Sequence, residues 1–338
     1  METLLFYYSL AIFFTCLLYS HPEGAGAVGI NYGVLGNNLP PYSAVVSRLQ
    51  QINVTKIRIF QPNNDLLTAL HNAGISVIVG TYNQDLKQLA TDPSAASAWV
   101  AANIIPHLPY VKITSLAAGN EVYPGELQQY LPAAMQNLDA ALVAAFLAIP
   151  VTTAISMQTL SSSYPPSAGV FTNDSTAVMG QIAQFLSSKK YPLLLNVYPY
   201  YARVGDPANV ELDYALFKSG NTSFDDGPNT YVNLFDALLD AVYTALEKVC
   251  ASNVEIVVSE TGWPSGGGSD ASIENAHTYV NNLIQHVTSG KGTPRRPGKE
   301  IQTYIFAMFN ENEKGEGVEQ HWGLHYPDLT PVYHVNHF

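Results

Sequence analysis

The chain has 338 residues, of which 27 are acidic and 15 are basic, so its net charge is −12 at pH 7. Such an acidic surface is repelled by nucleic acid and by anionic membranes, and we expect neither as a partner. The length is sufficient for a large hydrophobic core, and a neutral substrate is unaffected by the charge.

The first 27 residues have the pattern of a secretory signal peptide. Residues 4–19 are almost wholly apolar, and an A-x-A pattern follows at Ala25 and Ala27. The alternative is an uncleaved membrane anchor, but this apolar run is short for a span of roughly 20 residues. We predict cleavage near Ala27, a mature chain of 28–338 with a net charge of about −10, and no membrane contact after cleavage.

Cysteine and asparagine patterns agree with passage through the secretory route. Cys16 leaves with the signal peptide, so the mature chain keeps only Cys250 and forms no internal disulfide. Three sequons make Asn53, Asn173 and Asn221 candidate glycosylation sites.

Eight apolar, β-rich segments alternate with longer segments of helical periodicity. The predicted strands are 28–33, 56–60, 76–82, 113–120, 151–156, 193–198, 255–259 and 303–309. The predicted helices are 39–51, 66–73, 95–105, 127–146, 177–187, 232–249 and 273–288.

This alternation predicts a parallel sheet with covered faces, and eight repeats favour a single closed (β/α)8 TIM barrel over an open sheet. No G-x-G-x-x-G motif follows the first strand, which argues against a dinucleotide-binding fold. The segment 202–230 is rich in Gly, Pro, Asn and Asp, and we expect it to form a small subdomain after strand six.

Two glutamates stand at the ends of predicted strands. Glu121 follows strand four and Glu260 follows strand seven, so a barrel brings both to the C-terminal rim, where barrel active sites lie. A lone glutamate of this kind is usually a solvated loop residue, but two at matching strand ends indicate function. Glycoside hydrolysis requires a pair of carboxyl groups on opposite sides of a cleft.

Five motifs closely resemble those of the plant endo-1,3-β-glucanases of glycoside hydrolase family 17, and the resemblance runs from about residue 28 to 338. They are Gly-Ile-Asn-Tyr-Gly at 29–33, Gly-Asn-Glu-Val at 119–122, Asn-Val-Tyr-Pro-Tyr at 196–200, Ser-Glu-Thr-Gly-Trp-Pro-Ser at 259–265 and Phe-Ala-Met-Phe-Asn-Glu-Asn-Glu-Lys at 306–314. The motif around Glu260 is the most specific of the five.

The resemblance implies a retaining mechanism in which Glu121 is the acid/base and Glu260 the nucleophile. It also matches Glu311, Lys314 and Glu319 to auxiliary charged residues that tune ionisation of the nucleophile; the alternative is a surface ion network. A lysine among carboxylates lowers their pKa values through its opposite charge.

Several side chains near the strand ends are candidates for substrate binding. Asn120 could hydrogen-bond a sugar hydroxyl or cap a turn. The aromatic faces of Tyr32, Tyr198, Trp263 and Phe309 could stack on glucose rings or close the top of the barrel. The chain departs from the family pattern at Asn31, where these enzymes often have cysteine, and at Trp322, where phenylalanine is more usual.

The function that the resemblance implies is endo-hydrolysis of 1,3-β-glucan, such as callose or fungal wall glucan, by an extracellular enzyme of the apoplast or cell wall that serves plant defence or wall remodelling. Two alternatives remain: an endo-1,3;1,4-β-glucanase and a non-catalytic β-glucan-binding protein. The chain has no serine-hydrolase elbow, His-Glu-x-x-His or phosphate-loop motif, so we expect no cofactor and no metal. We expect a monomer whose partner is the polysaccharide substrate.

Overall fold

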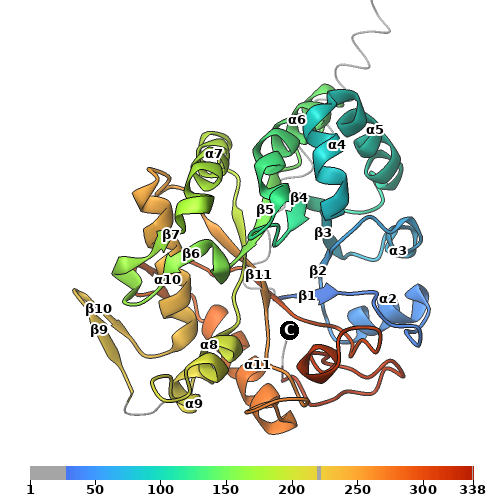
Figure 1. The fold of residues 1–338 in the computed structure, drawn as a ribbon. Coiled ribbons are helices and arrows are strands. Elements are labelled where there is room, and N and C mark those ends of the chain that lie inside the picture. Colours follow the sequence, from blue (N-terminus) through green and yellow to red (C-terminus); the bar gives the residue numbers. More distant parts are fainter. Residues whose placement is uncertain (1–27, 219–221, 337) are drawn as a thin grey trace, which may run out of the picture.

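Eight parallel strands close into a barrel in the computed structural model of this protein, which describes residues 28–218, 222–336 and 338. Around the barrel the order is β1, β2, β3, β4, β5, β8, β11 and β14, and β14 pairs with β1. Figure 1 labels β1 to β5 and β11 among these strands. The strands are β1 Gly29–Tyr32, β2 Lys56–Ile59, β3 Ser76–Gly80, β4 Ile113–Asn120, β5 Val151–Ser156, β8 Leu193–Asn196, β11 Ile256–Thr261 and β14 Thr303–Ile305. The predicted (β/α)8 barrel is confirmed.

Helices surround the barrel and connect successive strands (Figure 1). They are α2 Tyr42–Gln51, α3 Asn64–Ala69, α4 Leu86–Thr91, α5 Pro93–Asn103, α6 Leu131–Ala144, α7 Asn173–Lys189, α8 Pro199–Gly205, α9 Leu212–Ala215, α10 Leu234–Lys248 and α11 Ile273–Val287. Each predicted helix overlaps one of these. The short helices α4, α8 and α9 are not among the predicted helices.

The core has two layers because alternate residues of a strand point to opposite faces. One layer fills the barrel and draws one residue from each of six strands: Ile78, Ala117, Ala154, Leu194, Val257 and Tyr304. The larger layer packs the outer face of the strands against the helices. On β8, Asn196 shares the inward face with Leu194, and β8 therefore carries a polar amide at the C-terminal end of the barrel interior.

The strands that carry the two glutamates have irregular register at their C-terminal ends. Pairing of β4 with β5 shifts between Ala117 and Asn120, and pairing of β11 with β8 shifts between Val258 and Glu260. Such bulges re-aim side chains next to active sites.

The predicted subdomain after strand six contains α8, α9 and a hairpin of β9 (Phe224–Asp226) with β10 (Asn229–Tyr231). A second piece, not anticipated, comes from the connection after β5: β6 (Leu160–Ser162), η5 (Pro166–Ala168) and β7 (Val170–Phe171). Asp226 joins the two pieces, because it accepts hydrogen bonds from both the backbone nitrogen and the hydroxyl of Ser167, each at 2.6 Å.

Helix α10 is buried on nearly every side because this second piece covers its outer face. Gly169 follows η5 and lies against the α10 backbone, where an added Cβ would collide with the carbonyl group of Ala241. Two backbones approach here as closely as they do because residue 169 has no side chain.

We therefore predict that Gly169→Ala lowers the stability of the protein by about 1–3 kcal/mol through overpacking. The matched control is Gly180→Ala in α7, where an added Cβ meets nothing within 4 Å; it should raise stability by about 0.5–1 kcal/mol. Urea unfolding of both variants measures the effects. A Gly169→Ala protein as stable as the wild type would contradict the close packing.

Candidate active site

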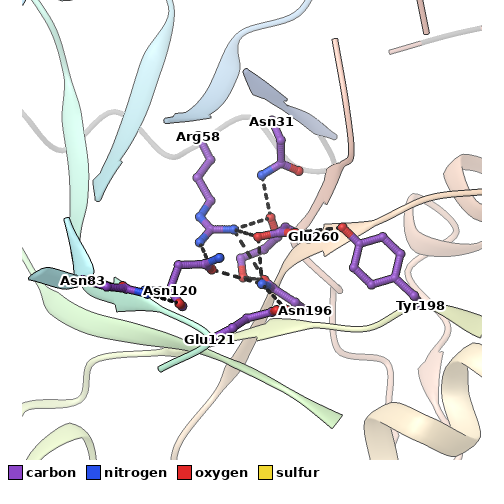
Figure 2. Close-up of polar contacts among 9 residues, drawn as sticks. Asn31, Arg58, Asn83, Asn120, Glu121, Asn196, Tyr198 and Glu260 are labelled. Atoms are coloured by element: carbon purple, nitrogen blue, oxygen red, sulfur yellow. Dashed lines mark hydrogen bonds and ion pairs between the residues drawn. The ribbon is translucent and has the colours of Figure 1, made fainter. Parts of the chain in front are cut away.

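Glu260 lies in β11 inside the C-terminal end of the barrel and is 5% exposed. Its Oε1 accepts hydrogen bonds from Arg58 Nη1 at 2.6 Å and Asn196 Nδ2 at 2.7 Å. Its Oε2 accepts one from the Tyr198 hydroxyl at 2.7 Å (Figure 2). Donors therefore hold both oxygens of this buried carboxylate.

Glu121 follows the last residue of β4 and, unlike Glu260, its side chain is exposed in the cleft. Its backbone has φ +48°, and Gly119 two residues earlier has φ +67°. Asn83 holds the intervening residue, since its side chain exchanges two hydrogen bonds with the Asn120 backbone, at 2.8 and 2.9 Å. Left-handed backbone is uncommon outside glycine, and such residues cluster at functional sites.

Asn196 connects the two glutamates. Its Nδ2 lies 2.9 Å from Glu121 Oε1 and 2.7 Å from Glu260 Oε1 (Figure 2). Because both oxygens bond to one nitrogen atom, they can be no farther apart than the sum of those distances, 5.6 Å. The two carboxylates predicted from the sequence therefore meet in one site.

Arg58 in β2 is the charged partner of Glu260, and it is 1% exposed. Its Nη1 bonds to Glu260, and its Nη2 donates to Asn120 Oδ1 at 2.7 Å. The guanidinium carbon lies 4.8 Å from the centre of the Phe60 ring, a cation–π distance. The sequence reading missed Arg58, although a charged residue in the middle of an apolar strand was the signal that could have found it.

The surroundings of Glu121 shift the pKa of its carboxyl group. Partial loss of water around the carboxyl raises the pKa of Glu121 above its ordinary value, and repulsion by Glu260 raises it further. The Asn196 hydrogen bond and the Arg58 charge act in the opposite direction. Burial and the neighbouring Glu260 charge raise the pKa of Tyr198 well above 10, so its phenol stays protonated and donates to Glu260.

The site opens into a cleft of about 700 Å³. All three predicted auxiliary residues line it, as do Asn120 and Tyr198. Lys314 Nζ lies 3.5 Å from Glu311 Oε2 and 4.1 Å from the centre of the Phe306 ring. Glu319 accepts a hydrogen bond from the Tyr201 hydroxyl at 2.7 Å. Within the described residues, the hydrogen bonds and ion pairs of these three residues do not reach Glu260.

Three of the predicted substrate-binding aromatics do not line this cleft. Tyr32 and Phe309 are each 2% exposed and pack edge to face against each other, 6.2 Å apart. Trp263 is 1% exposed, and its Nε1 donates to the Asp270 carbonyl group at 2.9 Å. All three side chains are buried and pack against neighbouring rings, so their faces are not available to a sugar in this cleft. Trp322 lines the cleft and packs 5.0 Å from Tyr198.

Other predicted features lie away from the cleft. Asn53 and Asn173 are exposed, as glycosylation requires, whereas Asn221 and the signal peptide fall outside the described residues. Cys250 is free and exposed. In the described ranges, no three His, Cys, Asp or Glu side chains gather as a metal ion would need, and no helix is both long and apolar enough to cross a membrane.

A closed (β/α)8 barrel with two carboxylates meeting at its C-terminal rim defines a class of glycoside-hydrolysing barrels. A profile of the glycosyl hydrolases family 17 matches residues 28–337, and the chain belongs to this family. It is therefore a glycoside hydrolase.

Similar proteins agree over almost the whole chain. A glucan endo-1,3-beta-glucosidase of Nicotiana tabacum, an acidic isoform, is 47% identical over 93% of this chain and 92% of its own. Lichenase-2 of Hordeum vulgare is 46% identical over 93% of this chain and all of its own. The solved structure of a beta-1,3-glucanase and allergen of Cryptomeria japonica pollen has a TM-score of 0.89 at 46% identity, over 91% of this chain and 98% of its own.

The buried ion pair yields a prediction about stability. Arg58→Met leaves the Glu260 charge without its cationic partner and should lower the free energy of unfolding by about 3–5 kcal/mol. In a Glu260→Gln background, where no charge needs compensation, the same change should cost less than half as much. Urea unfolding of the wild type, both single variants and the double variant forms the cycle. Equal losses in both backgrounds would contradict a stabilising ion pair.

Proposed function

We propose that this protein is a retaining endo-hydrolase of 1,3-β-D-glucosidic linkages in β-glucans, with Glu260 as nucleophile and Glu121 as acid/base. The observation that carries the mechanism is the convergence of both carboxylates on Asn196, which keeps their nearest oxygens within 5.6 Å. Retaining pairs lie about 5–5.5 Å apart, whereas inverting pairs lie about 6.5–9.5 Å apart to admit a water.

The surroundings of each carboxylate suit its proposed role. Glu121 has a raised pKa, which favours the protonated form that donates to the glycosidic oxygen as the bond to the anomeric carbon breaks. Glu260 is held by Arg58 and Tyr198 and attacks the anomeric carbon as a carboxylate. Glu121, now ionised, then takes a proton from water, and the hydroxide displaces Glu260 with overall retention of configuration.

The preference for 1,3 linkages is supported by the names of the Nicotiana and Cryptomeria relatives. A relative named lichenase is almost equally similar, so an endo-1,3;1,4-β-glucanase remains the second candidate. Both candidates need the same two carboxylates and differ in how the cleft fits the chain.

Asn120 and Tyr198 are the proposed substrate contacts of the sequence analysis that line the cleft. Asn120 Oδ1 is occupied by Arg58 and Asn196, at 2.7 and 3.1 Å. Its amide nitrogen then remains for a sugar hydroxyl close to Glu260. We propose that Lys314, Glu311 and Glu319 act on the cleft electrostatically, since they line it.

We further propose that the protein is secreted to the apoplast or cell wall and acts as a monomer. The apolar segment 4–19, the following A-x-A pattern and the three sequons support secretion. Mass spectrometry of protein recovered from the extracellular medium tests this by identifying the mature N-terminus near residue 28 and any modified sequon.

The acid role of Glu121 predicts a dependence on the leaving group. Glu121→Gln cannot donate a proton, so it should slow hydrolysis of a linear 1,3-β-glucan by about 10²–10⁴-fold. An aryl glycoside with a good leaving group needs little protonation, and its glycosylation step should slow far less. Glu274→Gln, an exposed change in the first turn of α11, is the control and should keep wild-type rates. Equal losses on both substrates would contradict the assignment.

Two measurements on the wild-type protein test the proposed reaction. Reducing-sugar release should be faster on linear 1,3-β-glucan than on mixed-linkage glucan, and absent on xylan. Faster release from mixed-linkage glucan would favour the second candidate, and no release from any glucan would favour a binding protein. Proton NMR of the first product should show the β-anomer, whereas an initial α-anomer would exclude retention and the nucleophile role of Glu260.

A further inference from the structure

Ser259 lies immediately before Glu260 in β11 and is completely buried. Its hydroxyl donates to Asn196 Oδ1 at 2.7 Å. Its carbonyl oxygen accepts hydrogen bonds from Asn31 Nδ2 at 2.8 Å and Arg58 Nη1 at 3.2 Å. The residues that line the cleft do not include Ser259, so its hydroxyl reaches the reaction only through the Asn196 amide.

The Asn196 amide has more acceptors than hydrogens. Its Nδ2 lies 2.7 Å from Glu260 Oε1, 2.9 Å from Glu121 Oε1 and 3.1 Å from Asn120 Oδ1, yet it carries only two protons. Rotation of the amide therefore decides which acceptors receive them. On the opposite side, Oδ1 has one short bond, from Ser259, and one long bond, from Arg58 Nη1 at 3.4 Å.

We propose that Ser259 is a positioning residue that fixes the plane of the Asn196 amide, so that its two protons are shared between Glu121 and Glu260. This inference rests on the proposed roles of the two glutamates. Without the hydroxyl, the long Arg58 contact is the one hydrogen bond that the described residues still make to the oxygen of this amide. It then turns toward its closest and charged acceptor, Glu260, and its bond to Glu121 weakens.

The sign of the effect follows from the charge of the acceptor. A hydrogen bond donated to a carboxylate favours the ionised form, so weakening the Asn196 bond raises the pKa of Glu121. Glu121 then stays protonated to higher pH, and the alkaline limb of the activity profile moves upward. The ionisable groups around the pair are unchanged by the substitution: Arg58 from β2, Tyr198 after β8, Tyr201 from α8, Glu311 and Lys314 after β14, and Glu319 from η6 (Gly317–Gln320).

The ordinary role for such a serine is to fill space and satisfy a buried hydrogen bond. That role predicts a loss of stability from Ser259→Ala and no shift in the pH profile of kcat/KM. A positioning role predicts the shift as well, and it predicts that the shift requires the Asn196 side chain. The two roles are therefore separated by a readout other than stability.

The test measures kcat/KM from pH 3 to 9 on a linear 1,3-β-glucan oligosaccharide for the wild type and Ser259→Ala. The alkaline limb of Ser259→Ala should lie roughly 0.5–1 pH unit above that of the wild type. Thr303→Val is the matched control, since it removes an equally buried hydroxyl from β14. Among the described residues, the partner of that hydroxyl is the Ile301 carbonyl oxygen, and the limbs of this variant should not move.

The second arm repeats the comparison in an Asn196→Ala background. Because the proposed effect passes through the amide, adding Ser259→Ala there should move the alkaline limb no further. An unmoved limb in the Ser259→Ala single variant, or the same shift in both backgrounds, would overturn the positioning role. Failure of the proposed function is seen separately, as a wild type that does not cleave the oligosaccharide.

Discussion

The ion pair between Arg58 and Glu260 is the interaction on which the site depends. Both side chains lie inside the end of the barrel, where water is excluded and an unpaired charge costs several kcal/mol. The pair persists because its members have further partners: Asn120, Asn196 and the Ser259 carbonyl group on the arginine side, and Asn196 and Tyr198 on the glutamate side. Of the charged groups of Arg58 and Glu260, Arg58 Nε is the buried atom that has no hydrogen-bond partner within the described residues. If one side chain in this network moves, the others lose a hydrogen-bond partner.

The network makes the two carboxylates unequal. Glu260 is enclosed by donors, while Glu121 stands at the edge of the cleft with one side-chain donor, Asn196, and a repelling neighbour. These unequal environments agree with the proposed division of roles, in which Glu121 is the general acid and Glu260 the nucleophile. The Asn196 amide donates to both carboxylates, so a small rotation of this amide would strengthen one hydrogen bond and weaken the other. In the proposed arrangement, the conformation of this amide follows from the hydroxyl of Ser259, a residue that does not line the cleft.

The difference between the positions of Glu121 and Glu260 begins in the backbone. Regular parallel strands would keep residues in simple alternation, but β4 and β11 both shift register where their glutamates emerge. The left-handed turn at Glu121 then directs one carboxyl outward into the cleft, while Glu260 stays within the barrel wall. Two side chains of the same length thus reach one amide from different depths. The barrel holds the two glutamates rigidly in place, because neighbouring strands hydrogen-bond on both sides of each bulge.

The sequence by itself determined the barrel, because eight apolar strands that alternate with amphipathic helices allow few other arrangements. It also identified the two glutamates as site candidates, because their motifs stand at matching strand ends. Only the tertiary structure decided which partners they have. Arg58, Asn196 and Glu260 are distant along the chain and meet because β2, β8 and β11 end at the same rim. For the same reason, the sequence could not distinguish Tyr198, which lines the cleft, from three aromatic residues that pack in the core, namely Tyr32, Trp263 and Phe309. Whether an aromatic side chain at a strand end faces the cleft or neighbouring rings depends on how the loops pack against one another.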